Sequence, residues 1–286
     1  MGVGAIEEAN LLTGTTESMP SSAYTTLDGD SYRPSSLTRG PWHPDHQHAG
    51  PPIALMCRAI ENAALKLGLT HLSRLTANLL RPVPIRDLAI AVVTNYVGRN
   101  TGHFSARLNV DDKEIANVTA LAQRESDVRL PDGLPGHPLP SAPRGPEESP
   151  PAIFPFDEKR VGYAGLVDTR IARGVFFQGP CAVWFRLRHP LLENEEPSVY
   201  QRVAVAADSG NGISAILDFA RYSFLNLDLT INLLRKPIGE WICLDAQTCL
   251  GSNGCGLAES MLYDLHGLIG RATQSLAVRA RESTTR

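Results

Sequence analysis

The 286-residue chain has little excess charge of either sign, few aromatic residues and no long apolar run. Its 27 Lys and Arg against 30 Asp and Glu give a net charge of −3, which argues against a nucleic-acid binder that neutralises phosphates. No apolar stretch approaches the roughly 18 residues that a membrane span requires. Residues 1–23 have neither the basic start nor the apolar centre of a secretory signal. We therefore expect a soluble, cytoplasmic protein with no nucleic-acid and no membrane partner.

Several common site motifs are also missing. The five cysteines are odd in number and form no Cys-x-x-Cys pair, which argues against a disulfide framework. No P-loop, dinucleotide fingerprint or serine nucleophile elbow is present. The only histidine cluster is His43, His46 and His48, with Asp45 among them, and no distant metal ligand accompanies it. We expect no metal and no cofactor, and we interpret this cluster as a loop folded over the start of the next helix.

What is present is the composition of a globular protein, with 43% apolar and 20% charged residues. A break in composition divides it, because residues 131–155 contain nine prolines, which favour extended and solvated backbone. We predict a disordered tail at 1–22, an N-terminal domain at 23–128, a linker at 129–158 and a C-terminal domain at 159–286.

Each half shows the same order of elements, a helix followed by antiparallel strands. In the first half, apolar residues at helical spacing follow Gly50 and reach Leu67, and strands are predicted at 71–81, 88–97, 102–110 and 114–123. In the second half, a helix is predicted at 213–224. Strands are predicted at 167–173, 181–188, 228–234, 241–249, 256–263 and 268–279.

The repeat has a register that can be checked. An offset of 154 residues places Arg81 on Arg235, Thr94 on Thr248 and Thr119 on Thr273. We infer a duplicated α+β unit in which a helix lies against a curved sheet.

Three polar residues of the second half fall where apolar residues are expected. Side chains alternate between the faces of a strand, and by this parity Gln274 and Thr248 point toward the core. Each could be an isolated core polar group with a local partner, but together they favour a shared polar pocket. Asp208 follows an apolar run and precedes the predicted helix, where it could cap free N–H groups or join that pocket. The nearby Gly210 and Gly212 leave backbone amides open to a ligand oxygen.

Six segments of the chain together form a recognisable pattern: residues 40–52, 74–84, 207–212, 228–230, 239–241 and 276–279. In these segments, and in their order across both halves, the chain resembles the acyl-CoA thioesterase II family. The resemblance covers about residues 25–125 and 160–281. It implies an α+β double hotdog, which is two tandem repeats that each have a long central helix wrapped by a curved antiparallel sheet. A further homo-oligomer is compatible with this arrangement.

The resemblance also implies a reaction and its residues. In the family an Asp, a Thr or Ser, and a Gln orient a water that hydrolyses an acyl-CoA thioester to a free acid and CoA. These positions fall on Asp208, Thr248 and Gln274, the residues that strand parity and helix capping also single out. The substrate carbonyl would lie against the amides of Gly210, Asn211 and Gly212, where the helix dipole stabilises an oxyanion.

Two alternatives stay open. Hotdog hydratases place a His five residues after the Asp, and that position here is Ile213. The other alternative is a non-catalytic acyl-CoA-binding protein with the same fold. In each case the expected partner is an acyl-CoA.

Overall fold

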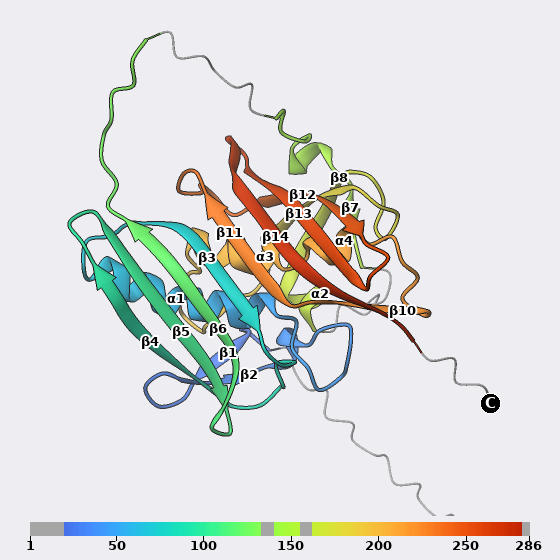
Figure 1. The fold of residues 1–286 in the computed structure, drawn as a ribbon, viewed down its shortest axis with the longest axis horizontal. Helices are drawn as coiled ribbons and strands as arrows, with labels where there is room; N and C mark the ends of the chain where they lie inside the picture. Colours follow the sequence, from blue (N-terminus) through green and yellow to red (C-terminus); the bar gives the residue numbers. More distant parts are fainter. Residues whose placement is uncertain (1–19, 133–139, 155–161, 282–286) are drawn as a thin grey trace, which may run out of the picture.

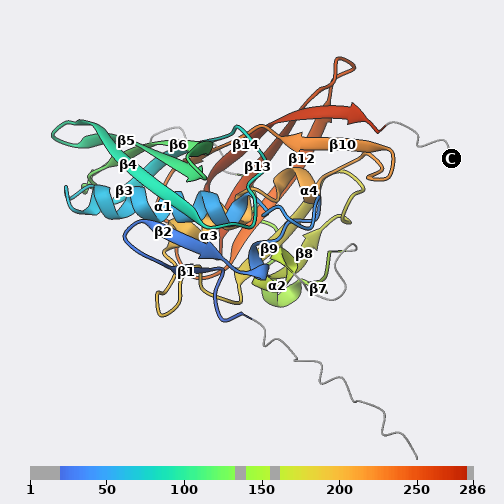
Figure 2. The same ribbon diagram turned by 90° about the horizontal axis from the view of Figure 1, so that it is seen from below.

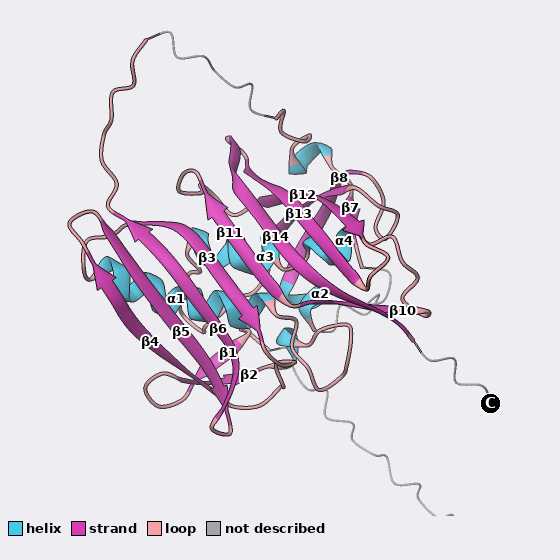
Figure 3. Cartoon of the chain, viewed as in Figure 1, coloured by secondary structure: helices cyan, strands magenta, loops and turns pink. Residues whose placement is uncertain are grey.

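One antiparallel sheet runs through the whole molecule in the computed structural model, which describes residues 20–132, 140–154 and 162–281 (Figure 1). The sheet has 14 strands, and its main path is β1-β2-β4-β5-β6-β3-β11-β14-β13-β12-β9-β8-β7, with β10 paired beside β14. Strands dominate both halves and the helices are few (Figure 3).

The first half supplies one long helix and six strands. They are β1 (Tyr24–Thr26), β2 (Ser31–Pro34), α1 (Gly50–Leu65), β3 (His71–Leu79), β4 (Leu88–Val97), β5 (Thr101–Val110) and β6 (Lys113–Gln123), with a 3₁₀ turn at Ser36–Thr38. The second half, from its 3₁₀ turn at Pro146–Glu148 onward, contains β7 (Pro151–Ala152), α2 (Tyr163–Leu166), β8 (Val167–Arg173), β9 (Cys181–Leu187), α3 (Val199–Ala207), α4 (Gly210–Ile213), β10 (Tyr222–Asn226), β11 (Asp228–Leu233), β12 (Ile242–Leu250), β13 (Cys255–Asp264) and β14 (Gly267–Ala280).

The two main helices lie inside the curve of the sheet, where α1 packs against α3 (Figure 2). The 16-residue helix α1 begins with two prolines, which a first turn tolerates, and buries Ile53, Met56 and Ile60 at helical spacing. The strand β1, at one end of the sheet, contacts the loop that follows β9, where the backbone N–H of Tyr24 donates to the carbonyl of Leu191. The apolar core is therefore shared by both halves.

The halves join through β3 and β11, and their register matches the duplication. Thr76 lies directly opposite Thr230, and the two hydroxyls are 3.2 Å apart. These two residues differ by 154 positions, the offset that the sequence predicts. On either side, Thr119 pairs with Thr76 and Thr273 pairs with Thr230. This symmetry confirms the predicted repeat.

The helix predicted at 213–224 is wrong. The second half places its helix earlier, at α3 (Val199–Ala207), where the Ser198 hydroxyl caps the Gln201 N–H. After Asp208 the chain forms only the four-residue helix α4, and residues 222–226 become the strand β10. Gly210 and Gly212 each disfavour a helix by about 1 kcal/mol, whereas the run before Asp208 is rich in alanine. The helix of this half is therefore the nine-residue α3, which ends at Asp208 before the predicted range begins, and it is not the long helix that was expected.

Part of the predicted linker packs on the C-terminal half. Pro146 and Ser149 are buried, β7 pairs with β8, and the Trp184 indole donates to the Arg144 carbonyl at 2.8 Å. Residues 133–139 and 155–158 of that segment lie outside the described residues, as do residues 1–19 of the predicted tail. None of the helices in the described part of the chain combines the length and apolarity that a bilayer crossing needs.

Candidate active site

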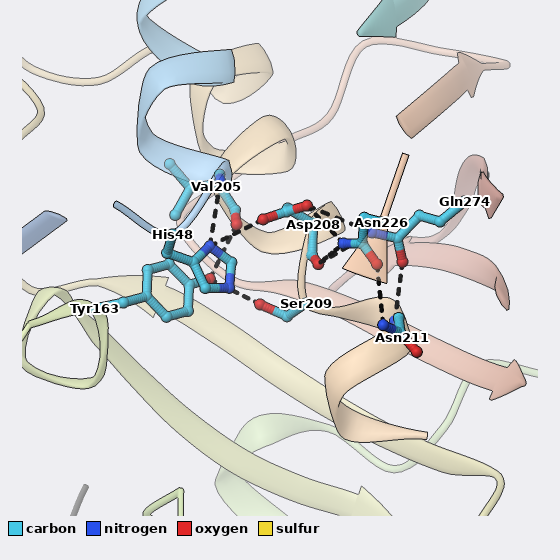
Figure 4. Close-up of polar contacts among 9 residues, drawn as sticks. His48, Tyr163, Val205, Asp208, Ser209, Asn211, Asn226 and Gln274 are labelled. Carbon is cyan, nitrogen blue, oxygen red and sulfur yellow. Dashed lines mark hydrogen bonds and ion pairs between the residues drawn. The ribbon is translucent and has the colours of Figure 1, made fainter. Parts of the chain in front are cut away.

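A buried polar cluster lies where α3 ends, between the start of α1 and the strands β10 and β14 (Figure 4). Asp208 is the C-cap of α3 and only 5% exposed, and Gln274 on the inner face of β14 is 2% exposed. The Gln274 amide donates to the Asp208 carbonyl at 3.1 Å and approaches carboxylate Oδ1 at 3.4 Å. Two of the three predicted catalytic residues therefore lie together.

The second neighbour of the Asp208 carboxylate is Asn226, at the end of β10. Its side-chain amide donates to Asp208 Oδ1 at 2.9 Å and to the Asp208 carbonyl at 3.3 Å. Its own side-chain oxygen accepts from the Asn211 amide at 3.0 Å. Asn226 thus links the carboxylate to the first turn of α4.

Thr248 is not part of this hydrogen-bonded cluster. Its hydroxyl lies 2.7 Å from the Ser214 hydroxyl, just beyond the end of α4, and Ser214 in turn donates to the Gly210 carbonyl. Strand parity assigned its inward direction correctly, because Leu244 and Ala246 on the same face of β12 are buried. The position beside Asp208 that we expected a strand hydroxyl to fill is taken by the amide of Asn226.

The other carboxylate oxygen contacts the N-terminal half. His48 Nδ1 lies 3.0 Å from Asp208 Oδ2, and both side chains are largely buried. The backbone N–H of Gly50 lies 3.2 Å from the same nitrogen and also hydrogen-bonds to the carboxylate. A Cβ at Gly50 would lie 2.6 Å from the Val205 carbonyl oxygen, so glycine permits α1 to approach the end of α3 this closely.

These contacts determine the charge of Asp208. Burial by itself raises the pKa of the carboxyl, but the His48 imidazole and hydrogen bonds from His48, Asn226 and Gly50 outweigh burial. The net result is a pKa below the ordinary value for aspartate. Asp208 is therefore a buried, ionised carboxylate at neutral pH.

The predicted substrate-binding residues Gly210, Asn211 and Gly212 form the first turn of α4. The Asn211 N–H donates to Gln274 Oε1 at 2.9 Å, while the Asn211 side-chain oxygen is buried with no hydrogen-bond partner among the described residues. A Cβ at Gly210 would press on Ser260 and Gln274, whereas one at Gly212 would meet nothing within 4 Å. Glycine is thus required for packing at 210, and open space adjoins Gly212.

Aromatic side chains border the cluster. Phe224, two residues before Asn226 on β10, is buried and its carbonyl accepts from the Asn211 side chain. The Trp42 ring stacks on Phe219 with centroids 5.3 Å apart and meets Phe224 edge-on. The loop that carries Trp42 also carries His48, so one segment of the N-terminal half supplies both an apolar wall and a polar contact.

The loop that carries His43, His46 and His48 is a polar loop over the start of α1, as predicted from the sequence. The rings of His43 and His46 contact each other at a tilt of 30° with centroids 4.4 Å apart, and His48 reaches Asp208. Within the described ranges no three His, Cys, Asp or Glu side chains are grouped as metal ligands would be.

Sequence reasoning missed two residues of the site. Asn226 escaped notice because residues 213–224 were interpreted as a helix, which hid the strand whose alternation places Phe224 and Asn226 on the inner face. His48 had no signal that linked it to Asp208, because the contact is made between the two halves. The helix cap at Ser198 is the signal that would have shifted the helix and exposed β10 as a strand.

The chain matches two thioesterase domains in tandem. The sequence model of the acyl-CoA thioesterase N-terminal domain matches residues 38–123, and that of the C-terminal domain matches residues 140–278. The chain belongs to the acyl-CoA thioesterase II family. No curated protein matches the sequence.

Solved structures share the fold at low sequence identity. A protein described as a thioesterase II from Thermobifida fusca YX has a TM-score of 0.69 at 14% identity, covering 91% of this chain and 96% of that chain. The acyl-CoA thioesterase II TesB2 of Mycobacterium marinum has a TM-score of 0.60 at 16% identity, covering 91% and 96%. A hotdog-fold protein from Alicyclobacillus acidocaldarius has a TM-score of 0.65 at 18% identity, covering 91% and 97%. With the two matched domains, these likenesses fit a double hotdog.

Proposed function

We propose that the protein hydrolyses acyl-CoA thioesters to a free acid and CoA, as a cytoplasmic enzyme of lipid metabolism that needs no cofactor. The observation that carries the proposal is the buried, ionised Asp208 carboxylate, bordered by the side-chain amides of Asn226 and Gln274. Membership of a thioesterase family supports the reaction class.

In this proposal one water is held by Asp208 Oδ1 and the two amides. As the water oxygen forms a bond to the thioester carbonyl carbon, one water proton passes to Asp208. When the C–S bond then breaks, that proton is returned to the leaving sulfur, which gives CoA thiol and a carboxylic acid. The low pKa makes Asp208 a weak base, so its main contributions are orientation of the water and fixed negative charge.

The carbonyl oxygen of the substrate would bind at the first turn of α4. We assign this role to the backbone amides of Gly210, Asn211 and Gly212, and the open space beside Gly212 supports it. Because the Asn211 N–H is bonded to Gln274, its use would couple the oxyanion site to the water site. We propose that Thr248, through Ser214, stabilises α4 rather than holding the water.

The phosphates of CoA need exposed basic side chains, and Arg235 is poorly suited to bind them. Arg235 makes a two-point ion pair with Asp264, with both N–O distances at 2.6 Å. A guanidinium held in this way is less available to a phosphate.

The decisive experiment follows thiol release from a panel of acyl-CoAs. Asp208→Asn keeps the shape and removes the charge, so we expect kcat to fall at least about 100-fold with little change in KM. The matched control is Asp45→Asn, whose side chain is 86% exposed and far less constrained. Turnover by Asp208→Asn equal to that of the native enzyme would contradict the proposal.

The hydratase alternative has one observation in its favour. Although position 213 is isoleucine, His48 supplies a histidine to Asp208 from elsewhere in the chain. Consumption of an enoyl-CoA double bond without thiol release would favour the hydratase, and acyl-CoA binding without either reaction would favour the binding protein.

A further inference from the structure

The contact between the side chains of His48 and Asp208 joins the two halves at the site. His48 lies on the loop just before α1, whereas Asp208 ends α3 in the other half. The Nδ1–Oδ2 distance is 3.0 Å, and the side chains are 13% and 4% exposed. Because both side chains are largely buried, salt and solvent screen the interaction between them little.

The imidazole is held from several sides. The Tyr163 ring of α2 stacks on it with centroids 3.7 Å apart and planes 4° from parallel. The Tyr163 hydroxyl is in turn fixed by the Val205 carbonyl and the Ser209 hydroxyl, each at 2.9 Å. The backbone N–H of His48 donates to the Thr38 carbonyl at 2.8 Å. The ring therefore has one well-defined orientation, with Nδ1 toward the carboxylate.

We propose that His48 is a positioning residue of the C-terminal site, and that its imidazole, 3.0 Å from Oδ2, holds the Asp208 carboxylate so that Oδ1 is aimed at the water position. This inference rests on the proposed function and deepens it, because it makes hydrolysis depend on a residue of the N-terminal half. Asp208 touches the water, and His48 acts through Asp208.

No other charged side chain in the described residues takes part in this contact. The neighbours of the carboxylate from β10 and β14 are the neutral amides of Asn226 and Gln274, and α1 contributes only the Gly50 N–H. Tyr163 on α2 stays neutral, because burial raises the pKa of its hydroxyl well above the ordinary value. Among the described residues, His48 is therefore the ionisable side chain that contacts the Asp208 carboxylate and opposes the effect of burial on its pKa.

Removal of the His48 imidazole should move the pKa of Asp208 in a definite direction. Burial raises the pKa of Asp208 and His48 lowers it. Without the imidazole, the carboxyl would take up a proton at a higher pH. The acid side of the pH profile of kcat would then move toward neutral pH.

The test compares His48→Asn with His43→Asn. Asparagine keeps a hydrogen-bond donor near the Nδ1 position but carries no charge, and His43 lies on the same loop with its side chain half exposed. For His48→Asn we expect the acid limb of kcat to rise by about 1–3 pH units. We also expect kcat at pH 6 to fall about tenfold or more, with KM within about threefold. His43→Asn should follow the native profile.

A folded His48→Asn enzyme with the native pH profile would overturn the inference. A variant whose kcat falls equally at every pH would overturn it too, since that is the result of a purely structural role. If His48→Asn does not fold, His48→Gln replaces it in the same comparison.

A measurement without substrate separates this inference from the proposed function. The Asp208 carboxyl can be titrated by 13C NMR in the native protein and in the variant, and Asp208→Asn identifies its signal. A higher pKa in His48→Asn would support the inference even if no acyl-CoA were hydrolysed, a result that would refute only the proposed function. An unchanged pKa would overturn the inference whatever the activity.

Discussion

At the scale of single residues, the site depends on a carboxylate that is buried and yet charged. Such a group is costly to bury unless hydrogen bonds and an opposite charge compensate for lost solvation. Here one oxygen of Asp208 faces amides of the C-terminal half and the other faces His48. In the proposed mechanism the two oxygens therefore have different roles: Oδ1 orients the water, and Oδ2 contacts His48.

Substitutions of Asn226 and Thr248 are expected to change kcat by different amounts. Asn226→Ala removes the 2.9 Å bond to the carboxylate and the bond that fixes Asn211, so we expect kcat to fall by about 10- to 100-fold. Thr248→Ala removes only the contact with Ser214, and we expect kcat to stay within about threefold. Steady-state kinetics of both variants with one acyl-CoA measure the two effects on kcat. The reverse order of effects would return the catalytic role to Thr248.

At the scale of elements, the break between α3 and α4 creates the site. In a continuous helix through 208–213, the backbone N–H groups would be used in hydrogen bonds within the helix. Instead α3 ends at Asp208, and α4 presents a new first turn next to β14. The strand β10 then brings Phe224 and Asn226 to the same face, because alternate residues share a side.

The hairpin of β13 and β14 is anchored by a second buried carboxylate, Asp264. It binds Arg235 and accepts N–H bonds from Ile238 at 2.9 Å and His266 at 2.8 Å. Burial raises its pKa, but the hydrogen bonds and charge of Arg235, together with those N–H groups, lower it below the ordinary value. A carboxyl with a lowered pKa stabilises the folded state above its unfolded pKa, and this contribution is lost as the pH falls through its folded value.

We therefore expect Asp264→Asn to lower the free energy of unfolding by about 1–3 kcal/mol at pH 7. The difference from the native protein should shrink as the pH falls below about 4, because the unfolded native chain then takes up a proton at Asp264 while the folded protein resists it. Urea unfolding at pH 7 and pH 3.5 measures both values. Asp87→Asn, which breaks the exposed pair with Arg33, is the control and should change stability little at either pH. An equal loss at both pH values would contradict the electrostatic explanation.

At the scale of the whole molecule, the two halves are one structure. They share the pairing of β3 with β11, the packing of α1 on α3 and one apolar core. Arg58 on α1 adds a two-point ion pair with Glu195 of the other half, at 2.5 and 2.6 Å. The site is itself a contact between the halves through His48 and Asp208.

From this arrangement we predict a single cooperative thermal unfolding transition. Arg58→Ala should lower that one Tm, by about 2–4 °C for each kcal/mol lost, without splitting it. Differential scanning calorimetry at several scan rates provides the measurement, with the exposed Arg33→Ala as a control. Two resolved transitions would show that the halves unfold independently.

The sequence alone was enough to predict ten of the fourteen strands, the duplication and the inward direction of Gln274, but not β1, β2, β7 and β10. These features follow from local alternation and from a repeat offset, and the pairing of Thr76 with Thr230 agrees with that offset. Residues 213–224 were misread because apolar residues spaced for a helix can also fill a loop and a strand, and only packing chooses between them.

Two partners of Asp208, Asn226 and His48, could be found only from the tertiary structure. Asn226 reaches Asp208 because β10 pairs with β14, and His48 reaches it because α1 packs against α3. Neither partner is close to Asp208 in the sequence, and no local rule of propensity or capping connects them. Folding brings these polar groups together because a charged carboxylate can be buried only where distant donors satisfy it.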